Sequence, residues 1–524
     1  MEKTGARRWW ALGALSVALL AVGLDLTVLN IALPTLAVDL HASTGTLQWF
    51  ADAYTLVLAA TLLPAGVLGD RYGRRRMLLF ALALFGAASA VCAWAPSAGA
   101  LIAARAVLGL AAAFLLPLSM SVLPVMFTEA ERPRAIGIWA TANMIGIPIG
   151  PIVGGLLLEH YWWGSVFLIN IPMAAIGILA VATLVPESRS STRQPLDLPG
   201  TLTSGIALLG VTYGVIRAGE HGWGEAGTLI SLLIGVVFAA IFVVTQRRSA
   251  HPLVDLALFR SKGFTWGTVL ATVVSFAMFG MLFALPQYFQ SVNGASTLIT
   301  GLRLLPMIGG MLIGVRIADR VVRRAGDKVV VAIGFGLMAA GLALGTATTT
   351  ATGYGLTATW LALMGAGLGF AMPTAMNAAM SPLSAERGGV GSALLMALRQ
   401  VGGAIGVAVL GAVLGAVYRG GLELTGLSTA IAAPVRDSVN TGVASAEKLG
   451  SARLLDTVRV AFTHGMDAML WVSAGLAALG VLIAVLFLPA SSATMKALDG
   501  PPAAQPESTA RPTEPEHEPR GVPR

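Results

Sequence analysis

Apolar runs of roughly 20 residues recur along the whole chain, separated by short polar segments. A helix of that length crosses a hydrocarbon core of ~30 Å. The pattern predicts about fourteen spanning helices in three groups. Six lie near 10–34, 49–69, 77–96, 100–126, 135–158 and 164–186, two near 199–217 and 226–246, and six near 263–288, 300–319, 328–348, 355–381, 389–416 and 467–489.

Composition supports the same class of protein. Of the 524 residues, 56% are hydrophobic and only 11% are charged, and the mean hydropathy is +0.78. A soluble protein of this length needs more charge to cover its surface. The first apolar run ends in LNIALP rather than in a small-residue cleavage site, which favours a retained helix over a signal peptide. We therefore expect an all-α polytopic membrane protein.

The net charge of +8 is explained by topology rather than by a nucleic-acid partner. Basic residues gather in alternate loops, and the loops between them are nearly free of Lys and Arg. The positive-inside rule then places both termini in the cytoplasm, with the chain in the cytoplasmic membrane. The basic residues on the inner side are Arg71, Arg74, Arg75, Arg76, Arg132, Arg134, Arg189, Arg193, Arg247, Arg248, Arg260, Lys262, Arg316, Arg320, Arg323, Arg324 and Lys328.

An internal repeat predicts how the helices are organised. GVLGDRYGRRRM (66–77) and GVRIADRVVRRAGDK (314–328) each join an Asp-Arg pair to a basic run, at the same loop of each half. Two six-helix halves joined by a helix pair are expected of secondary transporters. The predicted parts are a cytoplasmic N-terminus (1–9), a first half (10–186), a linker with two helices (187–262), a second half (263–490) with a long outer loop (417–466), and a disordered tail (491–524).

Asp25 lies inside the first apolar run, in AVGLDLTVLNIALP. It precedes the outer end of that helix by about nine residues, or ~13 Å. An ionised carboxylate at such depth is costly and usually faces a polar cavity. We interpret Asp25 as a proton-binding group and Arg105, buried in LIAARAVLGLAAA, as its partner. The alternatives are a carboxylate kept only for packing and a static ion pair.

A second carboxylate, Asp52, lies near the start of the second run in LQWFADAYTLVL. Trp49 and Tyr54 flank it, and Asn30 is on the first helix. Carboxylates and aromatic rings together attract lipophilic cations through charge and cation–π contact. We interpret these four residues as substrate-binding. An interfacial carboxylate in contact with water, with Trp49 as an ordinary belt aromatic, is an equal alternative.

Two further motifs favour conformational roles. In GIPIGPIVGG (146–155) the glycines Gly146, Gly150 and Gly154 make one smooth helix face and the two prolines bend the helix, and Gly155 is a further candidate residue of this motif. That combination suits a hinge between halves, and ordinary small-residue packing is the alternative. In GDRYGRRR (69–76) the glycines permit a tight turn and Asp70 can pair with Arg74. A charge latch is favoured there over purely topogenic charge, with candidate residues Gly69, Asp70, Arg71, Gly73, Arg74, Arg75, Pro148 and Pro151 in these two motifs.

These motifs resemble those of a major facilitator superfamily exporter, in the fourteen-helix drug:H⁺ antiporter branch of EmrB/QacA type. The resemblance covers almost all of residues 10–490. It includes GDRYGRRR, LIAARAVLGLAAA, GIPIGPIVGG and LDLTVLNIALP, together with WGSVFLINIP, PQYFQSVNG and RQVGGAIGVAV. It departs at Leu108, where the family usually has Gln. The resemblance implies alternating access, with Asp25 as the proton-linked carboxylate and Arg105 as its partner.

We therefore expect a proton-coupled exporter of lipophilic, cationic drugs or antibiotics, working as a monomer in the bilayer with protons and small molecules as partners. No Walker motif, metal-ligand spacing or Ser-His-Asp pattern is present, so an enzyme, a metal and a cofactor are not expected. A dedicated exporter of one endogenous antibiotic is an alternative. A proton-coupled importer or a non-transporting receptor is another, and the glycine-proline motif disfavours import.

Overall fold

The computed structural model describes residues 2–128, 131–189, 196–249, 252–383, 385–425 and 427–489. The predicted tail (491–524) and Arg193 lie outside these residues, as does the side chain of Pro148. Every regular element in the described part is helical, which confirms the all-α class. The first elements are α1 (Glu2–Asp39), α2 (Thr44–Tyr72), α3 (Arg74–Ala93), α4 (Ala98–Met126), α5 (Arg132–His160), α6 (Ser165–Leu168), α7 (Asn170–Leu184), α8 (Leu198–His221) and α9 (Ala226–Arg248).

The remaining elements are η1 (Leu256–Arg260), α10 (Lys262–Gln287), η2 (Tyr288–Val292), α11 (Thr297–Arg303), α12 (Leu305–Gly345), α13 (Tyr354–Met380), α14 (Ala385–Gly420), α15 (Thr429–Asp437), α16 (Val439–Lys448) and α17 (Ala452–Phe487). Polar residues in the connections cap several of them. Ser43 accepts a hydrogen bond from the Thr46 amide at the start of α2, and Ser97 does the same for Ala100 in α4.

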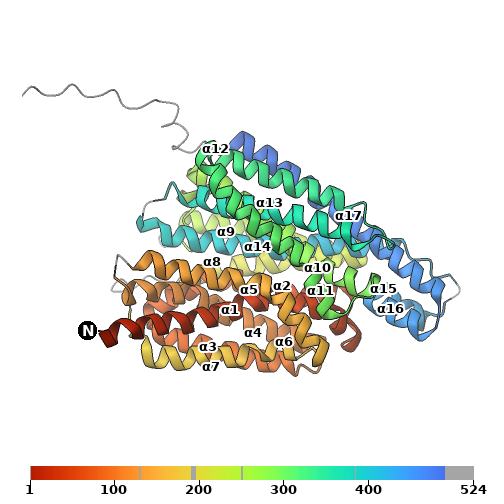
Figure 1. Ribbon diagram of the computed structural model, residues 1–524, viewed down its shortest axis with the longest axis horizontal. Helices are drawn as coiled ribbons and strands as arrows, with labels where there is room; N and C mark the ends of the chain where they lie inside the picture. Colours follow the sequence, from red (N-terminus) through yellow and green to blue (C-terminus); the bar gives the residue numbers. More distant parts are fainter. Residues whose placement is uncertain are drawn as a thin grey trace, which may run out of the picture.

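The helices form two bundles with a helix pair beside them (Figure 1). We call α1 to α7 the N-bundle, and α10 to α14 with α17 the C-bundle. Of the pair, α8 packs against both α2 and α14, and α9 packs mainly against α8. The glycines Gly210, Gly214 and Gly235 bring α8 and α9 close together, since a Cβ on any of them would overlap the facing helix. The pair therefore lies along the line where the two bundles meet.

Twelve helical stretches in the described residues are long and apolar enough to cross a membrane. The structure is thus a multi-pass membrane protein, and the predicted count of fourteen is not confirmed. Two regions of the chain account for the difference between twelve and fourteen. The stretch 297–345 counts as one span although Gly326 breaks its helical geometry at φ 78°, and in α5 only Ile149–His160 is counted, as a shorter apolar helix.

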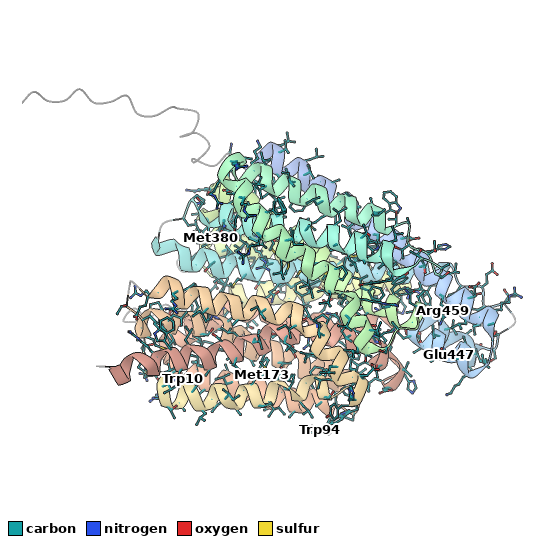
Figure 2. All side chains as sticks on the ribbon, viewed as in Figure 1. Trp10, Trp94, Met173, Met380, Glu447 and Arg459 are labelled. Atoms are coloured by element: carbon teal, nitrogen blue, oxygen red, sulfur yellow. The ribbon has the colours of Figure 1, made fainter. Side chains whose placement is uncertain are left out.

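The predicted outer loop (417–466) is largely helical. It contains α15 and α16, and the last helix begins at Ala452 rather than near 467. The reason is that α17 starts from a Ser451 cap and runs through a polar stretch before its apolar part, which a hydropathy pattern does not register. Figure 2 shows Glu447 and Arg459 at this end of the molecule, which we call the hairpin end, and Met380 toward the opposite end.

The opposite end carries the loop between α2 and α3 and the break at Gly326, and we call it the basic end. Exposed tryptophans mark the N-bundle near both ends, with Trp10 74% and Trp94 64% exposed (Figure 2). Such aromatic side chains are typical of the two membrane–water interfaces. The bundle axis therefore crosses the bilayer between these two levels.

The two bundles touch toward the hairpin end. Gln48 on α2 donates to the carbonyls of Val407 and Ala408 on α14, at 2.9 and 2.8 Å. Gln290 on η2 donates to the Ile31 carbonyl of α1 at 3.0 Å. Toward the basic end they part around a cavity of about 850 Å³, lined by α2, α4, α5, α14 and the segment 252–258. The structure is thus closed at one end of the interface and open at the other.

Candidate functional site

Asp25 on α1 and Arg105 on α4 form an ion pair inside the N-bundle, as the sequence predicted. Arg105 Nη1 lies 2.5 Å from Asp25 Oδ2, and the side chains are 2% and 0% exposed. Asn170, the first residue of α7, donates its Nδ2 to Asp25 Oδ1 at 3.1 Å. Both carboxylate oxygens therefore have partners, which offsets the cost of burying the charges.

The rest of the Arg105 side chain is held by α2. Its Nε donates to the Phe50 carbonyl at 3.0 Å, and its guanidinium lies 4.6 Å from the centroid of the Tyr54 ring. Gly109, one turn further along α4, contacts the Tyr54 backbone so closely that a Cβ there would overlap it. Helices α2 and α4 thus fix Arg105 between Asp25 and the meeting plane of the bundles.

Asp52 has the opposite environment. It is 0% exposed, and neither carboxylate oxygen accepts a hydrogen bond from any described residue. It borders a cavity of about 10 Å³, roughly the space of one water. The complete burial of Asp52 disagrees with the interpretation of a carboxylate at the water interface. The cavity's lining residues are Leu26, Leu29, Asn30, Ala51, Asp52, Thr55, Arg105, Phe279, Gly403 and Val407.

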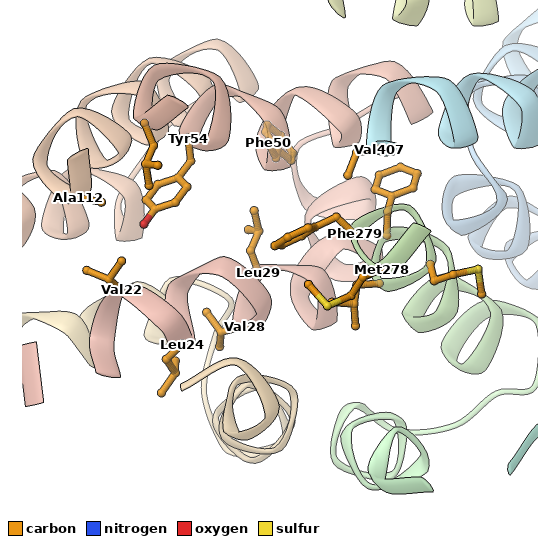
Figure 3. Close-up of a cluster of buried hydrophobic side chains, with 14 of the residues drawn as sticks. Val22, Leu24, Val28, Leu29, Phe50, Tyr54, Ala112, Met278, Phe279 and Val407 are labelled. Carbon is orange, nitrogen blue, oxygen red and sulfur yellow. The ribbon is translucent and has the colours of Figure 1, made fainter. Parts of the chain in front are cut away.

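This cavity lies where the two bundles meet. Its lining comes from α1, α2 and α4 on one side, and from α10 and α14 on the other. Figure 3 shows Leu29, Phe279 and Val407 converging on this region from the two bundles. The environment of a charged group in this cavity would therefore change whenever the two bundles move apart.

The four residues predicted to bind substrate do not share one place. Asn30 borders the cavity beside Asp52. Trp49 instead faces α8, with its ring 6.2 Å from that of Tyr213, and Tyr54 lies against Arg105. Neither ring is in the lining of the Asp52 cavity. The structure therefore brings Asp52, Asn30 and Arg105 together and leaves Trp49 and Tyr54 outside the cavity.

The loop between α2 and α3 holds four helices of the N-bundle together. Asp70 and Arg74 form an ion pair at 2.7 Å, and Gly73 makes the turn at φ 111°. Arg74 Nη1 donates to the Ser121 carbonyl of α4 at 3.1 Å, and Arg75 donates to the Ala182 carbonyl of α7.

Smaller contacts complete this loop. Gly69 leaves room for the Leu118 side chain of α4, and Arg71 lies over the ring of Tyr72 at 5.6 Å. The matching loop of the repeat has its own positive-φ glycine, Gly326, at 78°. The two repeats therefore share a turn as well as a charge pattern.

On α5 the glycine face packs against α1. A Cβ on Gly146 would overlap the α1 backbone at Leu20, one on Gly150 would overlap Thr27, and one on Gly154 would press on Val28. Because Asp25 lies between these contacts on α1, the glycine face determines where that carboxylate sits.

A neighbouring face of α5 contacts the C-bundle. A Cβ on Gly155 would overlap the backbone of Thr297 in α11, and the Pro151 carbonyl lies against Gly301. Thr297 also donates its hydroxyl to the Gly155 carbonyl at 3.1 Å. Helix α5 is therefore in contact with both bundles, as a hinge at their interface requires.

Several residues of the site were missed by the sequence reasoning. Asn170 also donates to Ser89 at 3.2 Å, so α3 joins the network around Asp25. Gln48 links the bundles one turn before Asp52. The sequence does carry a signal for Asn170 and Gln48, because each is an amide in or beside an apolar run, but a neutral amide there is a weaker signal than a charge.

One further cluster lies at the hairpin end, where Ser43 at the start of α2 donates to Glu220 at 2.8 Å and Thr44 donates to the Asp437 carbonyl at 2.9 Å. Burial raises the pKa of the Asp437 carboxyl, the charge of Glu220 raises it further, and Arg419 lowers it. No three His, Cys, Asp or Glu side chains gather as a metal site in the described ranges.

Comparison with known proteins agrees with this geometry. The Major Facilitator Superfamily model matches residues 15–407. The chain is 36% identical over 477 residues to the multidrug efflux pump LfrA of Mycolicibacterium smegmatis, covering 88% of this chain and 93% of that protein. It is 36% identical over 408 residues to the tetracenomycin C resistance and export protein of Streptomyces glaucescens, covering 77% and 76%.

Solved structures show the same fold at low identity. An inward-facing, unoccupied bacterial homolog of the human lysosomal transporter Spinster superposes with a TM-score of 0.65 at 14% identity, covering 95% of this chain and 99% of that one. A D-xylose-proton symporter superposes with a TM-score of 0.60 at 16% identity, covering 93% and 99%. With a family model over most of its length and two bundles meeting at a buried polar cavity, the chain belongs to the Major Facilitator Superfamily of membrane transporters, and it is a transporter rather than an enzyme.

Proposed function

We propose that this protein is a proton-coupled antiporter that exports lipophilic, cationic drugs or antibiotics across the cytoplasmic membrane. The observation that carries the proposal is Asp52, a fully buried carboxylate for which no described residue supplies a hydrogen bond to either oxygen, in a cavity between the bundles. A buried charge normally has a partner. A cationic substrate, or a proton, is the partner that a transporter would supply at this place.

Arg105 can couple proton binding at Asp25 to substrate binding at Asp52, because it lies next to both sites. It pairs with Asp25 and also lines the cavity of Asp52. When a proton neutralises Asp25, the hold on Arg105 weakens, and the guanidinium charge becomes available to Asp52. A cation at Asp52 is then repelled. Protonation of Asp25 from one side of the membrane would thus release substrate to that side.

The open cavity supports loading from the basic end. That end carries the Arg-rich loops, so the positive-inside rule assigns it and both termini to the cytoplasm. The cavity of about 850 Å³ is large enough for a drug-sized molecule. Contacts of Gln48, Gln290 and Thr44 close the other end. These features support the proposal that this is the state that accepts substrate from inside.

The fourteen-helix branch is part of this proposal. Counting α5 as a full span and the two arms of α12 on either side of Gly326 as separate spans converts twelve to fourteen. The domain limits follow as 10–186 for the first half, 187–262 for the linker with α8 and α9, and 263–490 for the second half. The packing of α8 on both α2 and α14 supports a monomer in which the helix pair lies along the line where the two bundles meet.

A dedicated exporter of one endogenous antibiotic is the second candidate. It is favoured by relatives whose names describe resistance to single compounds, the tetracenomycin C protein and the methylenomycin A resistance protein of Streptomyces coelicolor, which is 33% identical over 403 residues. The same site and coupling would serve such an exporter. Only the shape of the substrate would differ.

The test is exchange in liposomes containing the full chain, with an imposed pH gradient. Ethidium movement and lumenal pH are followed together. Wild type is expected to exchange dye for protons, Asp25→Asn to abolish the exchange, and Asp52→Asn to weaken it for cations. Asp39→Asn is the matched control, because Asp39 is an exposed carboxylate at the end of the same helix as Asp25. Normal exchange by Asp25→Asn contradicts the mechanism, and a wild type that moves neither dye nor protons favours the dedicated exporter.

A further inference from the structure

A group of buried polar atoms without partners lies in the C-bundle, away from Asp25 and Asp52. Four side-chain atoms there have no hydrogen-bond partner among the described residues: Arg303 Nη1, Thr348 Oγ1, Trp360 Nε1 and Asp467 Oδ1. Thr348 and Trp360 are both 0% exposed. Buried polar groups that lack a protein partner are normally satisfied by water or by a bound species.

These atoms come together in one layer of the bundle. Leu470 of α17 and the Trp360 ring of α13 both lie against Gly345 of α12. Asp467 is three residues before Leu470, and Thr348 is three residues after Gly345, so both lie about one turn from this contact. The unpartnered atoms of Thr348, Trp360 and Asp467 therefore lie around one contact near the hairpin end of the C-bundle.

Tyr288 on η2 lies in this layer. Its hydroxyl donates to the Thr349 carbonyl at 3.2 Å, and the charges of Arg303 and Asp467 both act on it. The guanidinium of Arg303 lies 5.6 Å from the Phe289 ring and 5.4 Å from the Tyr354 ring. Among the described residues no carboxylate forms an ion pair with it. A hydroxyl and an indole without partners among the described residues thus lie in the same layer as one half-buried carboxylate, and the guanidinium of Arg303 acts on Tyr288 beside them.

We propose that this layer is a hydrated chamber in which Asp467 is a second proton-binding group of the protein. Water that satisfies Thr348, Trp360 and Arg303 brings protons to the Oδ1 of Asp467. The step is a simple transfer: a hydronium ion gives its proton to the carboxylate, which becomes a carboxylic acid, and water remains. The groups that face Asp467 are Tyr288 from η2 and His464 from its own helix.

The chamber is separate from the proposed coupling site. Asp467 belongs to α17, and none of the residues that line the Asp52 cavity comes from that helix. Proton binding at Asp467 therefore does not require the Asp25–Arg105 pair to change. The consequence for stoichiometry rests on the proposed antiport function: export would use a proton at Asp467 in addition to the one at Asp25.

The first experiment measures protonation without transport. Infrared difference spectra of the purified full-length protein are recorded through a pH titration, and the band of a protonated carboxyl group is followed. We expect Asp467→Asn to remove one titrating buried-carboxyl band. Asp456→Asn, which changes an exposed carboxylate on the same helix, is expected to leave it. A titration identical in wild type and Asp467→Asn would overturn the proposal.

A second pair of variants keeps the test decisive if Asp467→Asn does not fold. Tyr288→Phe and Thr348→Val leave Asp467 in place and remove hydroxyls from the chamber. Each is expected to shift the midpoint of the Asp467 band, whereas Thr457→Val, on the exposed early part of α17, is not. Unshifted midpoints in both chamber variants would contradict a hydrated site.

Transport then tests the stoichiometry separately. In liposomes, Asp467→Asn is expected to lower the number of protons moved per dye molecule, with Asp456→Asn equal to wild type. If wild type shows no exchange, the antiport function fails while the infrared result still decides proton binding. An unchanged proton-to-dye ratio in Asp467→Asn would contradict the second coupled proton.

Discussion

Asp25 and Asp52 are both completely buried carboxylates, one on each of the first two helices, and they differ in every partner. Asp25 has Arg105 on one oxygen and Asn170 on the other. Asp52 has no hydrogen-bond partner among the described residues and faces a cavity between the bundles. The partners of a paired carboxylate offset the free energy that its burial costs, whereas nothing offsets that cost for an unpaired one.

Under the proposed function, this difference gives the two carboxylates separate tasks. The fold has completed the surroundings of Asp25, so a change in its charge would act directly on Arg105 and Asn170. It has left the surroundings of Asp52 incomplete, in the place where a ligand and the opposite bundle can both reach it. Arg105, which contacts Asp25 and lines the cavity of Asp52, is the physical link between them.

The largest effect is expected from Asp25→Asn. The substitution leaves the Arg105 guanidinium buried without a counter-charge, and breaking a buried pair in this way costs about 3–5 kcal/mol. Thermal unfolding of the purified protein measures it, with Asp39→Asn as the exposed control. A melting temperature equal to wild type would show that Asp25 and Arg105 are not a structural pair, and the comparison with Asp52 would then collapse.

Gly150→Ala is expected to have the next largest effect. The added Cβ would overlap the Thr27 hydroxyl and approach the Leu24 carbonyl on α1, next to Asp25. Overpacking of this kind costs about 1–3 kcal/mol and would displace Asp25 relative to Arg105. Thermal stability and dye exchange measure it.

The matched control for that substitution is Gly137→Ala on the same helix, where an added Cβ meets nothing within 4 Å. We expect it to be neutral or slightly stabilising, because Ala favours a helix over Gly. Equal stability of the two variants would mean that the glycine face does not fix the position of α1.

The packing of α1 on α5 illustrates how much of the fold the sequence could predict. Apolar runs predicted most helices, and glycine spacing predicted the smooth face of α5. The partners of Gly150 and Gly155 could not be predicted, because nothing local states which helix meets which face. The early start of α17 was also missed, since its first turns are polar and lie beyond the apolar pattern.

The site shows the same division. Charge in an apolar run identified Asp25, Arg105 and Asp52, because burying a charge is costly wherever it occurs. The aromatic residues Trp49 and Tyr54 were misplaced relative to the cavity, because sequence neighbours on a helix point about 100° apart per residue. Neutral amides such as Asn170 carry a weaker signal, and their role appears only once α7 is packed against α1.

Asp52→Asn is expected to lower affinity rather than stability. It removes a carboxylate that has no hydrogen-bond partner among the described residues, so the free energy of unfolding should stay within about 0.5 kcal/mol of wild type or rise. Loss of the attraction for a cation should weaken ethidium binding by about tenfold, or ~1.4 kcal/mol. Dye fluorescence titration of the purified protein measures the Kd. An unaltered Kd together with a lowered melting temperature would reverse the assignment of tasks between the two carboxylates.

The smallest effect is expected from Gln48→Ala, which loosens the cavity of Asp52 without touching Asp25. Gln48 joins α2 to the carbonyls of Val407 and Ala408, one turn before Asp52. Loss of these bonds removes roughly 1 kcal/mol from the state that is closed at the hairpin end, about a fivefold shift in population. Distances between spin labels placed across that end measure the shift. Thr61→Ala is the control, since its hydroxyl bonds only within α2. A shift of equal size in both variants would mean that the Gln48 hydrogen bonds do not set the equilibrium between the closed and open hairpin end. A shift in Gln48→Ala alone would show that a contact between the bundles keeps the cavity of Asp52 closed. Such a contact is what allows a substrate bound at Asp52 to control the separation of the bundles.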